Sequence, residues 1–474
     1  MKKAIAVGII LLAALLRLYD LGNPPLFFDE SVHSYFVNAV LKGSYRYDPA
    51  FHGPLLFYTV APIIYFLGEN EFTLRLLPAV LGVVLVCSIF LYRRYIGDAA
   101  YFAALFVAVS PVIVNYSRFY REDVYQLLFT SLVIYFLLRY LEGRRSWKEF
   151  KVDRYTAYLI SASTFLALFS AVKETFYVFA ALLLIYLIFD LKRIRIFDAF
   201  LALLAFSILY TTFYTNLWTD FSAFKGIENF PAVRAVEYWK YQHDIARISG
   251  PPYYYFELIL IYDLPAFLLA LVAIYRWLKG EKDEFTSIFV FLFLANFFFY
   301  SCMQEKVPWL VVHIEFPMFI LAAKVANRKS TTLAAIYLLF GCVMLNVVNP
   351  VNPAEPALYL PTQYDVREIS ANFVNYDRVY ILATAGEYWP LVWYLKNYSY
   401  FVYQNFEDLK IQPKSVIVAN QTQAAEVYLT NRETMVVRCW TFWTKPEINK
   451  IPEFLILRRP LAEVYCMNFT IFYT

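Results

Sequence analysis

Long apolar runs constrain the fold of this chain more than any other feature. Eleven predominantly apolar stretches have the length of about 17–20 residues that a helix needs to cross a bilayer. Charged residues make up only 17% of the 474 residues, against about 25% in ordinary soluble domains. We therefore predict an α-helical polytopic membrane protein. Its spans are expected near residues 4–21, 73–92, 99–116, 122–140, 155–172, 174–191, 197–216, 257–277, 285–302, 308–324 and 331–348.

The distribution of lysine and arginine predicts which loops face the cytoplasm. A further apolar stretch, 52–68, is short and contains Pro54 and Pro62. If it does not span and the N-terminus is cytoplasmic, every inner loop is basic, as the positive-inside rule requires. If it spans, all later basic clusters face outward. We therefore expect eleven spans, an interfacial helix at 52–68 in the first outer loop, and an outer tail. The inner segments are MKK, YRRY, RYLEGRRSWKEFKVDRY, DLKRIRIFD, YRWLKGEKDE and KVANRKS.

The tail has a different composition. Residues 349–361 are rich in proline and resemble a linker, and short β-branched runs then alternate with helix-like stretches, which indicates an α/β domain. We expect a transmembrane domain at 1–350 and a small extracytoplasmic α/β domain at 351–474. Cys439 and Cys466 are expected to pair there if the surroundings are oxidising.

Two carboxylates and a histidine follow the first span, in NPPLFFDESVHSYF. A carboxylate near the hydrocarbon boundary is partly desolvated and is a better base near neutral pH. Adjacent helical side chains diverge by about 100°, so only one of the two points directly into a pocket. We expect Asp29 to be the base and Glu30 to support it. His33 has the helical spacing to pair with either; solvated carboxylates and an interfacial histidine are the alternatives.

His52 precedes a Gly-Pro pair at the head of the interfacial helix, where free backbone N–H groups favour an anion such as a phosphate. A helix-capping histidine is the alternative. Lys173 and Glu174 join two predicted spans with almost no loop between them. Ionisable groups so close to the bilayer usually face a functional cavity.

The segment NYSRFYREDVYQLLF is densely charged at the junction of two spans. Arg118 and Arg121 have i, i+3 spacing and can meet one phosphate if the segment is helical, since the planar guanidinium binds two oxygens. Pairing of these arginines with Glu122 and Asp123 is the alternative.

The segment MQEKVPWLVVH also places charged residues at the end of a predicted span. Lys306 lies beside Pro-Trp and is expected to contact an anionic headgroup. A salt bridge to Glu305 or Glu174 is the alternative. His313 lies one to two turns into its span, where it is either a ligand-binding group or a structural partner of Glu315.

These outer segments combine anion-holding cations with proton-accepting carboxylates next to lipid. A sugar carried on a polyprenyl phosphate needs both, because cations stabilise the departing phosphate and a carboxylate takes the proton of the acceptor hydroxyl. The expected partners are a polyprenyl-phosphate sugar donor, membrane lipid and an acceptor glycan, lipid or protein, with no nucleic acid. Paired carboxylates also suit a divalent cation such as Mg²⁺ or Mn²⁺, and that possibility stays open.

The order of the motifs resembles a known superfamily. FFDESVHSYFVNAVLKG, FHGPLLFY, GENEFTLRLLPAVLG and SRFYREDVYQLLF are similar to segments of the protein-O-mannosyltransferases and aminoarabinose transferases, which are GT-C glycosyltransferases. QEKVPWLVVH and GEYWPLVWYLKNY resemble a narrower archaeal group of flippase-activity-associated membrane proteins.

The resemblance covers essentially the whole chain. It implies a GT-C fold with interfacial helices in the first outer loop and a polyprenyl-phosphate donor. It also implies a catalytic Asp29, with Asp123 as the acid of the second segment. His52, followed by Gly53, stands where the aminoarabinose transferases often have lysine, which is a departure from the family pattern.

Two function classes remain after these observations. The first is a glycosyltransferase that acts on the extracytoplasmic face of the cell membrane. The second is a flippase or flippase accessory that binds a lipid-linked saccharide without catalysis. An ion-coupled transporter is disfavoured because midplane charges and repeated halves are not evident in the sequence.

Overall fold

The computed structural model describes residues 2–143, 151–188, 191–245, 248–384, 386–425, 427, 429, 431–441 and 448–474. Residues 144–150 and 189–190, parts of two predicted inner clusters, lie outside the described residues. The chain forms two compact units, which are described separately. The first comprises Met1–Leu21, Val37–Glu69 and Thr73–Val348, and the second comprises Gly22–Phe36, Asn70–Phe72 and Asn349–Thr474.

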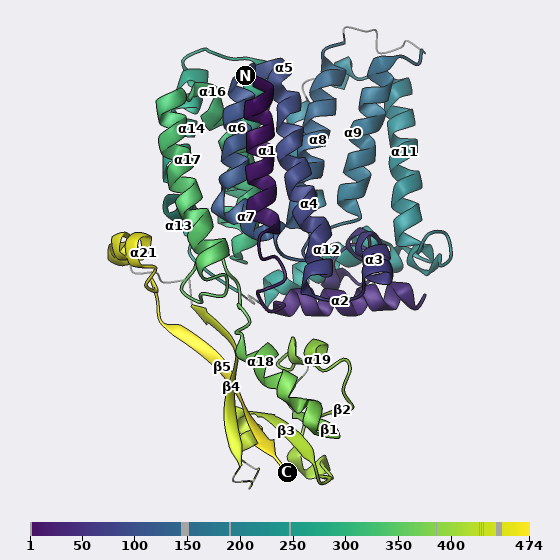
Figure 1. Ribbon diagram of the computed structural model, residues 1–474. Helices are drawn as coiled ribbons and strands as arrows, with labels where there is room; N and C mark the ends of the chain where they lie inside the picture. The colour runs from purple at the N-terminus through teal and green to yellow at the C-terminus, as the bar shows by residue number, and fades with distance from the viewer. Residues whose placement is uncertain are drawn as a thin grey trace. The chain divides into compact units, whose positions relative to one another are not determined.

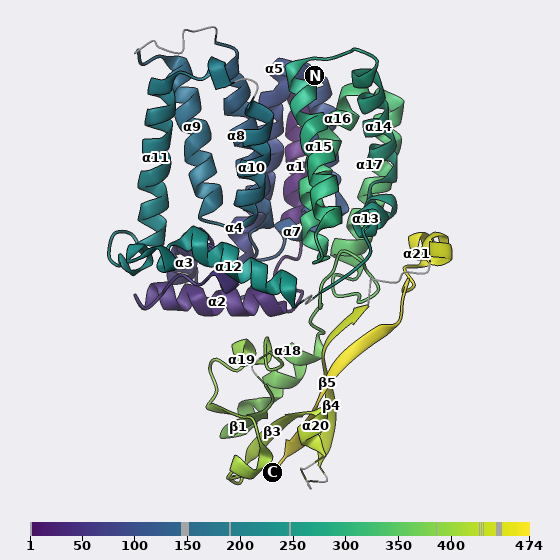
Figure 2. The same cartoon turned by 180° about the vertical axis from the view of Figure 1, so that it is seen from behind.

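The first unit is helical (Figures 1 and 2). Its helices are α1 (Lys2–Leu18), α2 (Phe28–Leu41, of which the part up to Phe36 belongs to the second unit), α3 (Leu55–Leu67), α4 (Glu71–Ile89, of which the part up to Phe72 belongs to the second unit), α5 (Arg93–Ile96), α6 (Ala99–Val109), α7 (Pro111–Ser117), α8 (Asp123–Leu141), α9 (Arg154–Ser170), α10 (Thr175–Leu187), α11 (Ile196–Tyr214), α12 (Pro231–Asp244), α13 (Tyr254–Tyr262), α14 (Leu264–Leu278), α15 (Glu284–Cys302), α16 (Val312–Val325) and α17 (Arg328–Val343). Short 3-10 or π turns are η1 (Pro49–Phe51), η2 (Phe90–Tyr92), η3 (Leu191–Arg193), η4 (Ser222–Phe224), η5 (Ile227–Asn229), η6 (Pro308–Val311) and η7 (Met344–Val348).

Each of the eleven predicted apolar stretches coincides with helix. Among the described residues, six helices are long and apolar enough to cross a membrane, or up to eight if each of two bent pairs counts as one span. The number of spans and the orientation of the termini therefore stay predictions. The stretches predicted at 99–116 and 257–277 each form two helices instead of one, because α6 and α7 meet at 63° and α13 and α14 meet at 111°.

Proline in the first turn of the second helix accounts for both breaks. Ser110 accepts a hydrogen bond from the N–H of Ile113 (3.2 Å) and caps α7, and Pro111 follows it. Asp263 precedes α14, which carries proline in its first turn. Proline cannot donate the i→i−4 hydrogen bond that would continue the preceding helix. The chain therefore starts a new helix at each place.

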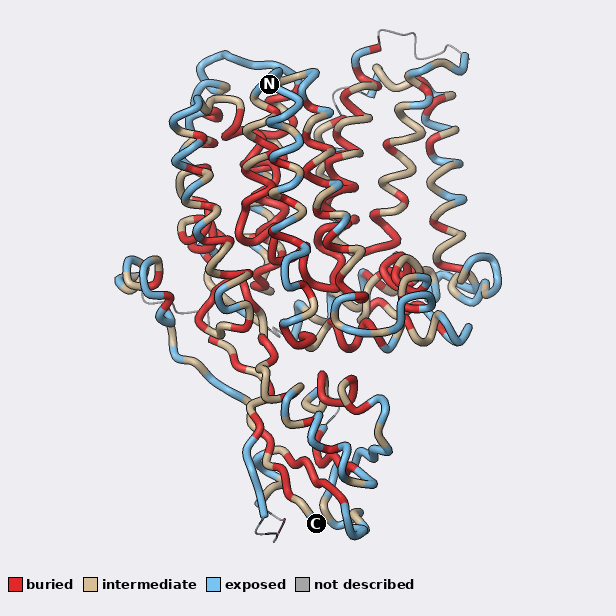
Figure 3. Tube along the Cα trace, in the orientation of Figure 1, coloured by how far each residue is buried: buried red, intermediate tan, exposed pale blue. Residues whose placement is uncertain are grey.

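The helices of the first unit differ widely in burial (Figure 3). In the apolar window of Pro308–Val325, which contains α16, 83% of the residues are buried, whereas in that of Ile196–Tyr214, which forms α11, only 17% are. Apolar residues that stay exposed on a helix are expected where lipid is the solvent. Helix α16 therefore lies in the protein interior, and α11 presents most of its surface to the surroundings.

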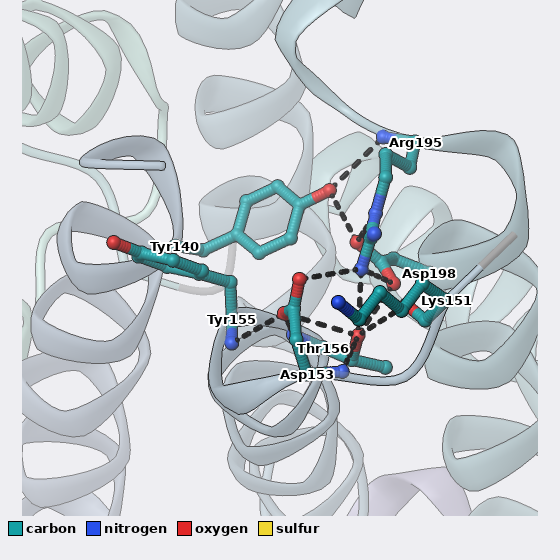
Figure 4. Close-up of polar contacts among 7 residues, drawn as sticks. All are labelled: Tyr140, Lys151, Asp153, Tyr155, Thr156, Arg195 and Asp198. Carbon is teal, nitrogen blue, oxygen red and sulfur yellow. Dashed lines mark hydrogen bonds and ion pairs between the residues drawn. The ribbon is translucent and has the colours of Figure 1, made fainter. Parts of the chain in front are cut away.

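A buried ion-pair network joins α8, α9 and α11 (Figure 4). The guanidinium of Arg195 donates to Asp198 through Nε (2.7 Å) and to Thr156 Oγ1 through Nη2 (2.8 Å). Tyr140 donates its hydroxyl to Asp198 (2.9 Å) and accepts from the N–H of Arg195 (3.0 Å). Both charged side chains are fully buried. Arg195, counted above in a basic cluster, is therefore a structural residue.

The second unit contains a five-stranded sheet in the order β2-β1-β3-β5-β4. The first three of these strands run parallel, and β5 is antiparallel to β3 and β4. Its elements are α18 (Asp365–Ala371), η8 (Asn372–Asn375), β1 (Arg378–Leu382), α19 (Leu391–Tyr394), β2 (Tyr400–Tyr403), η9 (Phe406–Asp408), β3 (Ser415–Asn420), α20 (Gln421–Ala424), β4 (Arg432–Thr441), η10 (Ile448–Lys450), α21 (Ile451–Leu457) and β5 (Val464–Tyr473). The α/β tail predicted from the sequence is confirmed.

Alternating side chains give the sheet an apolar core on each face. Val379 and Ile381 of β1 belong to one cluster, and Tyr380 and Leu382 belong to the other. Parallel strands covered on both sides are typical of α/β domains.

Cys439 and Cys466 stand opposite each other in β4 and β5 and form a disulfide.

At the carboxyl ends of β1 and β3, Glu387 accepts hydrogen bonds from Thr384 and Asn420. Burial acts to raise the pKa of Glu387, but these hydrogen bonds outweigh it and hold that pKa below the usual range.

Candidate functional site

A backbone contact brings two charged segments of the first unit together. The N–H of Gly53 donates to the carbonyl of Val172 (2.9 Å), and the N–H of Leu55 donates to the carbonyl of Ala171 (2.9 Å). A Cβ on residue 53 would overlap the carbonyl oxygen of Ala171, so only glycine fits. The residues just before Gly53 and just after Val172 therefore lie side by side.

The centre of the site is the ammonium of Lys173, which is 3% exposed. Its Nζ lies 3.4 Å from Glu122 Oε2 and 3.6 Å from Asp123 Oδ1. Glu122 ends the bend before α8, Asp123 begins α8, and Lys173 precedes α10. Carboxylates so deeply buried need a cation beside them, because burial of an unpaired charge is costly.

Arg121 supplies a second cation. Its Nε lies 3.0 Å from Asp123 Oδ2, and its guanidinium lies 4.1 Å from the ring centre of Trp309. The Lys173 ammonium lies 5.5 Å from the same ring. Trp309 lies in η6, at the start of the buried α16. Its ring thus makes a cation–π contact with each of the two cations.

His52 lies between carboxylates. Its Nδ1 is 2.8 Å from Glu174 Oε2, and its Nε2 is 3.8 Å from Glu122 Oε1. Its ring stacks on Trp239 of α12 with an interplanar angle of 7°. Helix α3 begins at Leu55, so His52 is not the residue at the head of that helix, which corrects the expectation that it borders the free N–H groups there. Here it instead contacts two acids.

A cavity of about 470 Å³ adjoins this cluster. Helices α10, α12 and α15 and the turn η6 line it with mostly apolar and aromatic side chains, and Lys173, Glu174 and Trp309 are part of its wall. Cavities of about 300–1,000 Å³ with a few polar groups are typical of small-molecule sites. The arrangement suits a ligand with an apolar body and a charged head.

Two predicted phosphate-binding cations have other partners. The guanidinium of Arg118 donates to the carbonyls of Leu16, Arg17 and Tyr19 at the end of α1. Residues 118–122 are not helical, so the predicted helical pairing of Arg118 with Arg121 is wrong. Free carbonyls at a helix end attract cationic donors.

The ammonium of Lys306 also donates to carbonyls at a helix end. Its ammonium donates to the carbonyls of Tyr300, Ser301 and Met303 at the end of α15. These carbonyls are the observed partners of Lys306, and its contact to an anionic headgroup stays a prediction. Glu305, its neighbour, lines the cavity.

His313 is buried in α16 and stacks on Tyr300 with ring centres 5.8 Å apart. Asn296 donates to its backbone carbonyl (3.0 Å). Glu315, its expected structural partner, instead accepts a hydrogen bond from Ser110 (3.3 Å). The expected pairing of His313 with Glu315 is therefore not among the observed contacts of the described residues.

Asp29, Glu30 and His33 belong to the second unit. All three lie on α2, which begins at Phe28, and Glu30 accepts a hydrogen bond from the N–H of Phe27 (2.9 Å). Glu30 is fully buried, whereas Asp29 is partly exposed. Glu30 thus serves as a cap at the start of α2.

Trp239 lies in α12, in a part of the chain that contains none of the motifs described in the sequence analysis. An amphipathic pattern rich in aromatics at 231–244 was the available signal. Within the described residues, no group of three or more His, Cys, Asp or Glu side chains is arranged to hold a metal ion.

Comparisons with known proteins agree with this architecture. Residues 51–218 match the family described as dolichyl-phosphate-mannose-protein mannosyltransferase. The crystal structure of ArnT from Cupriavidus metallidurans in the apo state superposes with a TM-score of 0.67 at 12% identity, over 99% of this chain and 98% of that one. The chain therefore has the same fold as ArnT.

A second ArnT structure, bound to undecaprenyl phosphate, matches this chain with a TM-score of 0.66 at 14% identity, over 98% and 97% of the two chains. The S. cerevisiae Pmt1-Pmt2 complex bound to the sugar donor matches at a TM-score of 0.35, 18% identity, 53% of this chain and 36% of that one, which is too weak to bear on the fold. A search of curated proteins finds no match. Membership of the narrower archaeal group stays a prediction.

Proposed function

We propose that this chain is a membrane glycosyltransferase that moves a sugar from a polyprenyl-phosphate donor to an acceptor hydroxyl. The observation that carries the proposal is the apolar cavity of about 470 Å³ with the Lys173 ammonium in its wall. An isoprenoid chain is apolar and its phosphate is anionic, so both parts of such a donor have a complementary surface. The ArnT structure bound to undecaprenyl phosphate supports the same ligand class.

The reaction needs no nucleotide. The acceptor oxygen attacks the anomeric carbon of the sugar and forms the new glycosidic bond, while a base takes the hydroxyl proton. The bond from that carbon to the phosphate oxygen breaks, and its electron pair leaves with the polyprenyl phosphate. Electrostatic stabilisation of developing charge is usually the largest single contribution of a protein to such a rate.

Lys173 and Arg121 are the proposed holders of the leaving phosphate. Both are buried, where a charge interaction is stronger than in water, and both already border carboxylates. Glu122 and Asp123 are proposed to orient the cations and to accept hydrogen bonds from sugar hydroxyls. His52 and Glu174, which contact each other, are proposed to contribute to the same binding surface.

Asp29 is the proposed general base, and catalysis is proposed to occur on the extracytoplasmic face. Capping by Glu30 of the N–H of Phe27 supports this assignment, because it gives Glu30 a structural role and leaves Asp29 as the carboxylate suited to proton transfer.

The test is sugar transfer in membranes or nanodiscs, with a panel of polyprenyl-phosphate hexoses and pentoses. Asp29→Asn keeps the size of the side chain and removes its basicity, so kcat is expected to fall by about 10²–10⁴-fold. Asp365→Asn, in α18 of the same unit, is the matched control and should retain kcat. Wild-type turnover in the Asp29 variant would refute the base assignment. Lipid translocation without any transfer by the wild type would replace the proposal with the flippase function.

A further inference from the structure

The tail domain holds the segment that carries Asp29. Residues Gly22–Phe36 and Asn70–Phe72 belong to the same compact unit as Asn349–Thr474. More than 270 residues of sequence separate the first two segments from the third, so their association is a long-range feature of the fold. The contacts that create it converge on one short helix, α19, and two arginines.

Helix α19 is anchored in the apolar core beside the sheet. Leu391, Val392 and the following Leu395 are part of that core, and Tyr394 packs against it. Trp393 and Tyr394 also contact the first-loop segment. Because the core anchors the helix, these two aromatic side chains have little freedom to move.

Trp393 fixes the second turn of α2. Its Nε1 donates to Ser34 Oγ (3.0 Å), and both residues are buried, at 7% and 0% exposure. Ser34 lies four residues after Glu30, on the same face of the helix. Asp29 diverges from Glu30 by about 100° around the helix axis. The hydrogen bond to Ser34 therefore fixes the rotation of α2 and, with it, the direction of the Asp29 side chain.

Tyr394 fixes the entry to α2. Its hydroxyl accepts from the N–H of Leu26 (2.9 Å) and donates to Glu71 Oε1 (3.2 Å). Leu26 lies three residues before Asp29, and Ser34 lies five residues after it. The segment is therefore held on both sides of Asp29 by adjacent residues of one helix.

Two arginines strengthen the same attachment. Arg367 donates to the backbone carbonyl of Asn23 (2.7 Å). The guanidinium of Arg438 lies 5.1 Å from the ring centre of Phe28, directly before Asp29, a distance suited to a cation–π contact.

We propose that Trp393 and Tyr394 are positioning residues that set the orientation of Asp29 through Ser34 and Leu26. The role rests on the proposed function of Asp29 as general base. In this account the tail domain takes part in every turnover, whatever the acceptor. Displacement of a catalytic group by about 1 Å is enough to lower a rate substantially.

The experiment compares Trp393→Phe, Tyr394→Phe and Ser34→Ala in the full-length chain. Each single change is expected to lower kcat about tenfold, the factor for one net hydrogen bond, with the KM for the donor unchanged. Ser34→Thr keeps the acceptor oxygen and should keep wild-type kcat. Tyr400→Phe, an exposed tyrosine on β2 of the same domain, is the matched control.

A double-mutant cycle separates positioning from a general loss of stability. Trp393→Phe with Ser34→Ala should be no slower than either single variant, because both remove the same hydrogen bond. Multiplied rate losses, a change confined to KM, or wild-type kcat in Trp393→Phe would each overturn the positioning role while leaving Asp29 as the base.

Hydrogen exchange gives a readout that does not depend on turnover. The amides of residues 26–34 should exchange faster in the Trp393→Phe and Tyr394→Phe variants than in the wild type. Unchanged exchange would overturn the attachment itself. Faster exchange in a chain whose wild type transfers no sugar would support the attachment and refute the proposed function.

Discussion

Replacement of Gly53 by alanine tests the contact on which the site depends. The added Cβ would overlap the carbonyl of Ala171, so residues 53–55 must separate from 171–172. Two backbone hydrogen bonds, each of 2.9 Å, are then lost. At about 1 kcal/mol net for each, the free energy of unfolding should fall by about 2 kcal/mol.

The functional effect of Gly53→Ala should exceed its effect on stability. Lys173 follows Val172 directly, so separation of the two segments moves the ammonium away from Glu122 and Asp123. Donor binding is therefore expected to weaken at least tenfold at a temperature where the variant is still folded.

Thermal unfolding in detergent and polyprenyl-phosphate binding measure the two effects. Gly8→Ala is the matched control, because a Cβ at Gly8 meets nothing within 4 Å and alanine favours the helix by about 0.5–1 kcal/mol. Unfolding and binding of Gly53→Ala that match the wild type would show that the close approach of residues 53 and 171 is not what organises the site.

Three further predictions concern stability. Asp198→Asn removes the closer of the two carboxylates that pair with the buried Arg195, whose other partner is Asp153 at 3.4 Å, and should cost about 1.5–3 kcal/mol, measured as a lower unfolding temperature; an unchanged temperature would contradict the network. Joint replacement of Cys439 and Cys466 by serine should destabilise the second unit by about 3 kcal/mol, from the 27-residue separation they close, and equal denaturant midpoints would contradict this. Because the pKa of Glu387 is lowered by folding, its stabilisation is present above about pH 4.5 and lost as pH falls further; Glu387→Gln should flatten that acid limb of the unfolding profile, and an unaltered limb would refute the assignment.

Local patterns predicted the helices and the α/β tail, because hydrophobic length and alternation are properties of adjacent residues. Ser110 and Asp263 are polar residues near proline, yet run length alone does not show that a helix breaks there. A single sequence therefore places helices better than it places their interruptions.

The partners of the charged residues were harder to predict. Arg118 and Lys306 have the charge that a phosphate requires, but the carbonyl ends of α1 and α15 are nearer acceptors. Lys173 and Asp123 were both predicted at short junctions between spans, and the structure brings them to within 3.6 Å of each other; their role stays a prediction. The attachment of Trp393 to Ser34 joins residues 359 positions apart, and no local pattern encodes it.

Binding of polyprenyl phosphate to the purified chain, followed by native mass spectrometry, tests the central claim most directly. The wild type should retain the lipid, Lys173→Met should bind it at least tenfold more weakly, and Lys173→Arg should recover much of the affinity. Lys225→Met, at an exposed lysine of the same unit, should bind like the wild type. Equal affinity of the wild type and Lys173→Met, with both folded, would contradict a lipid-phosphate site at this cavity.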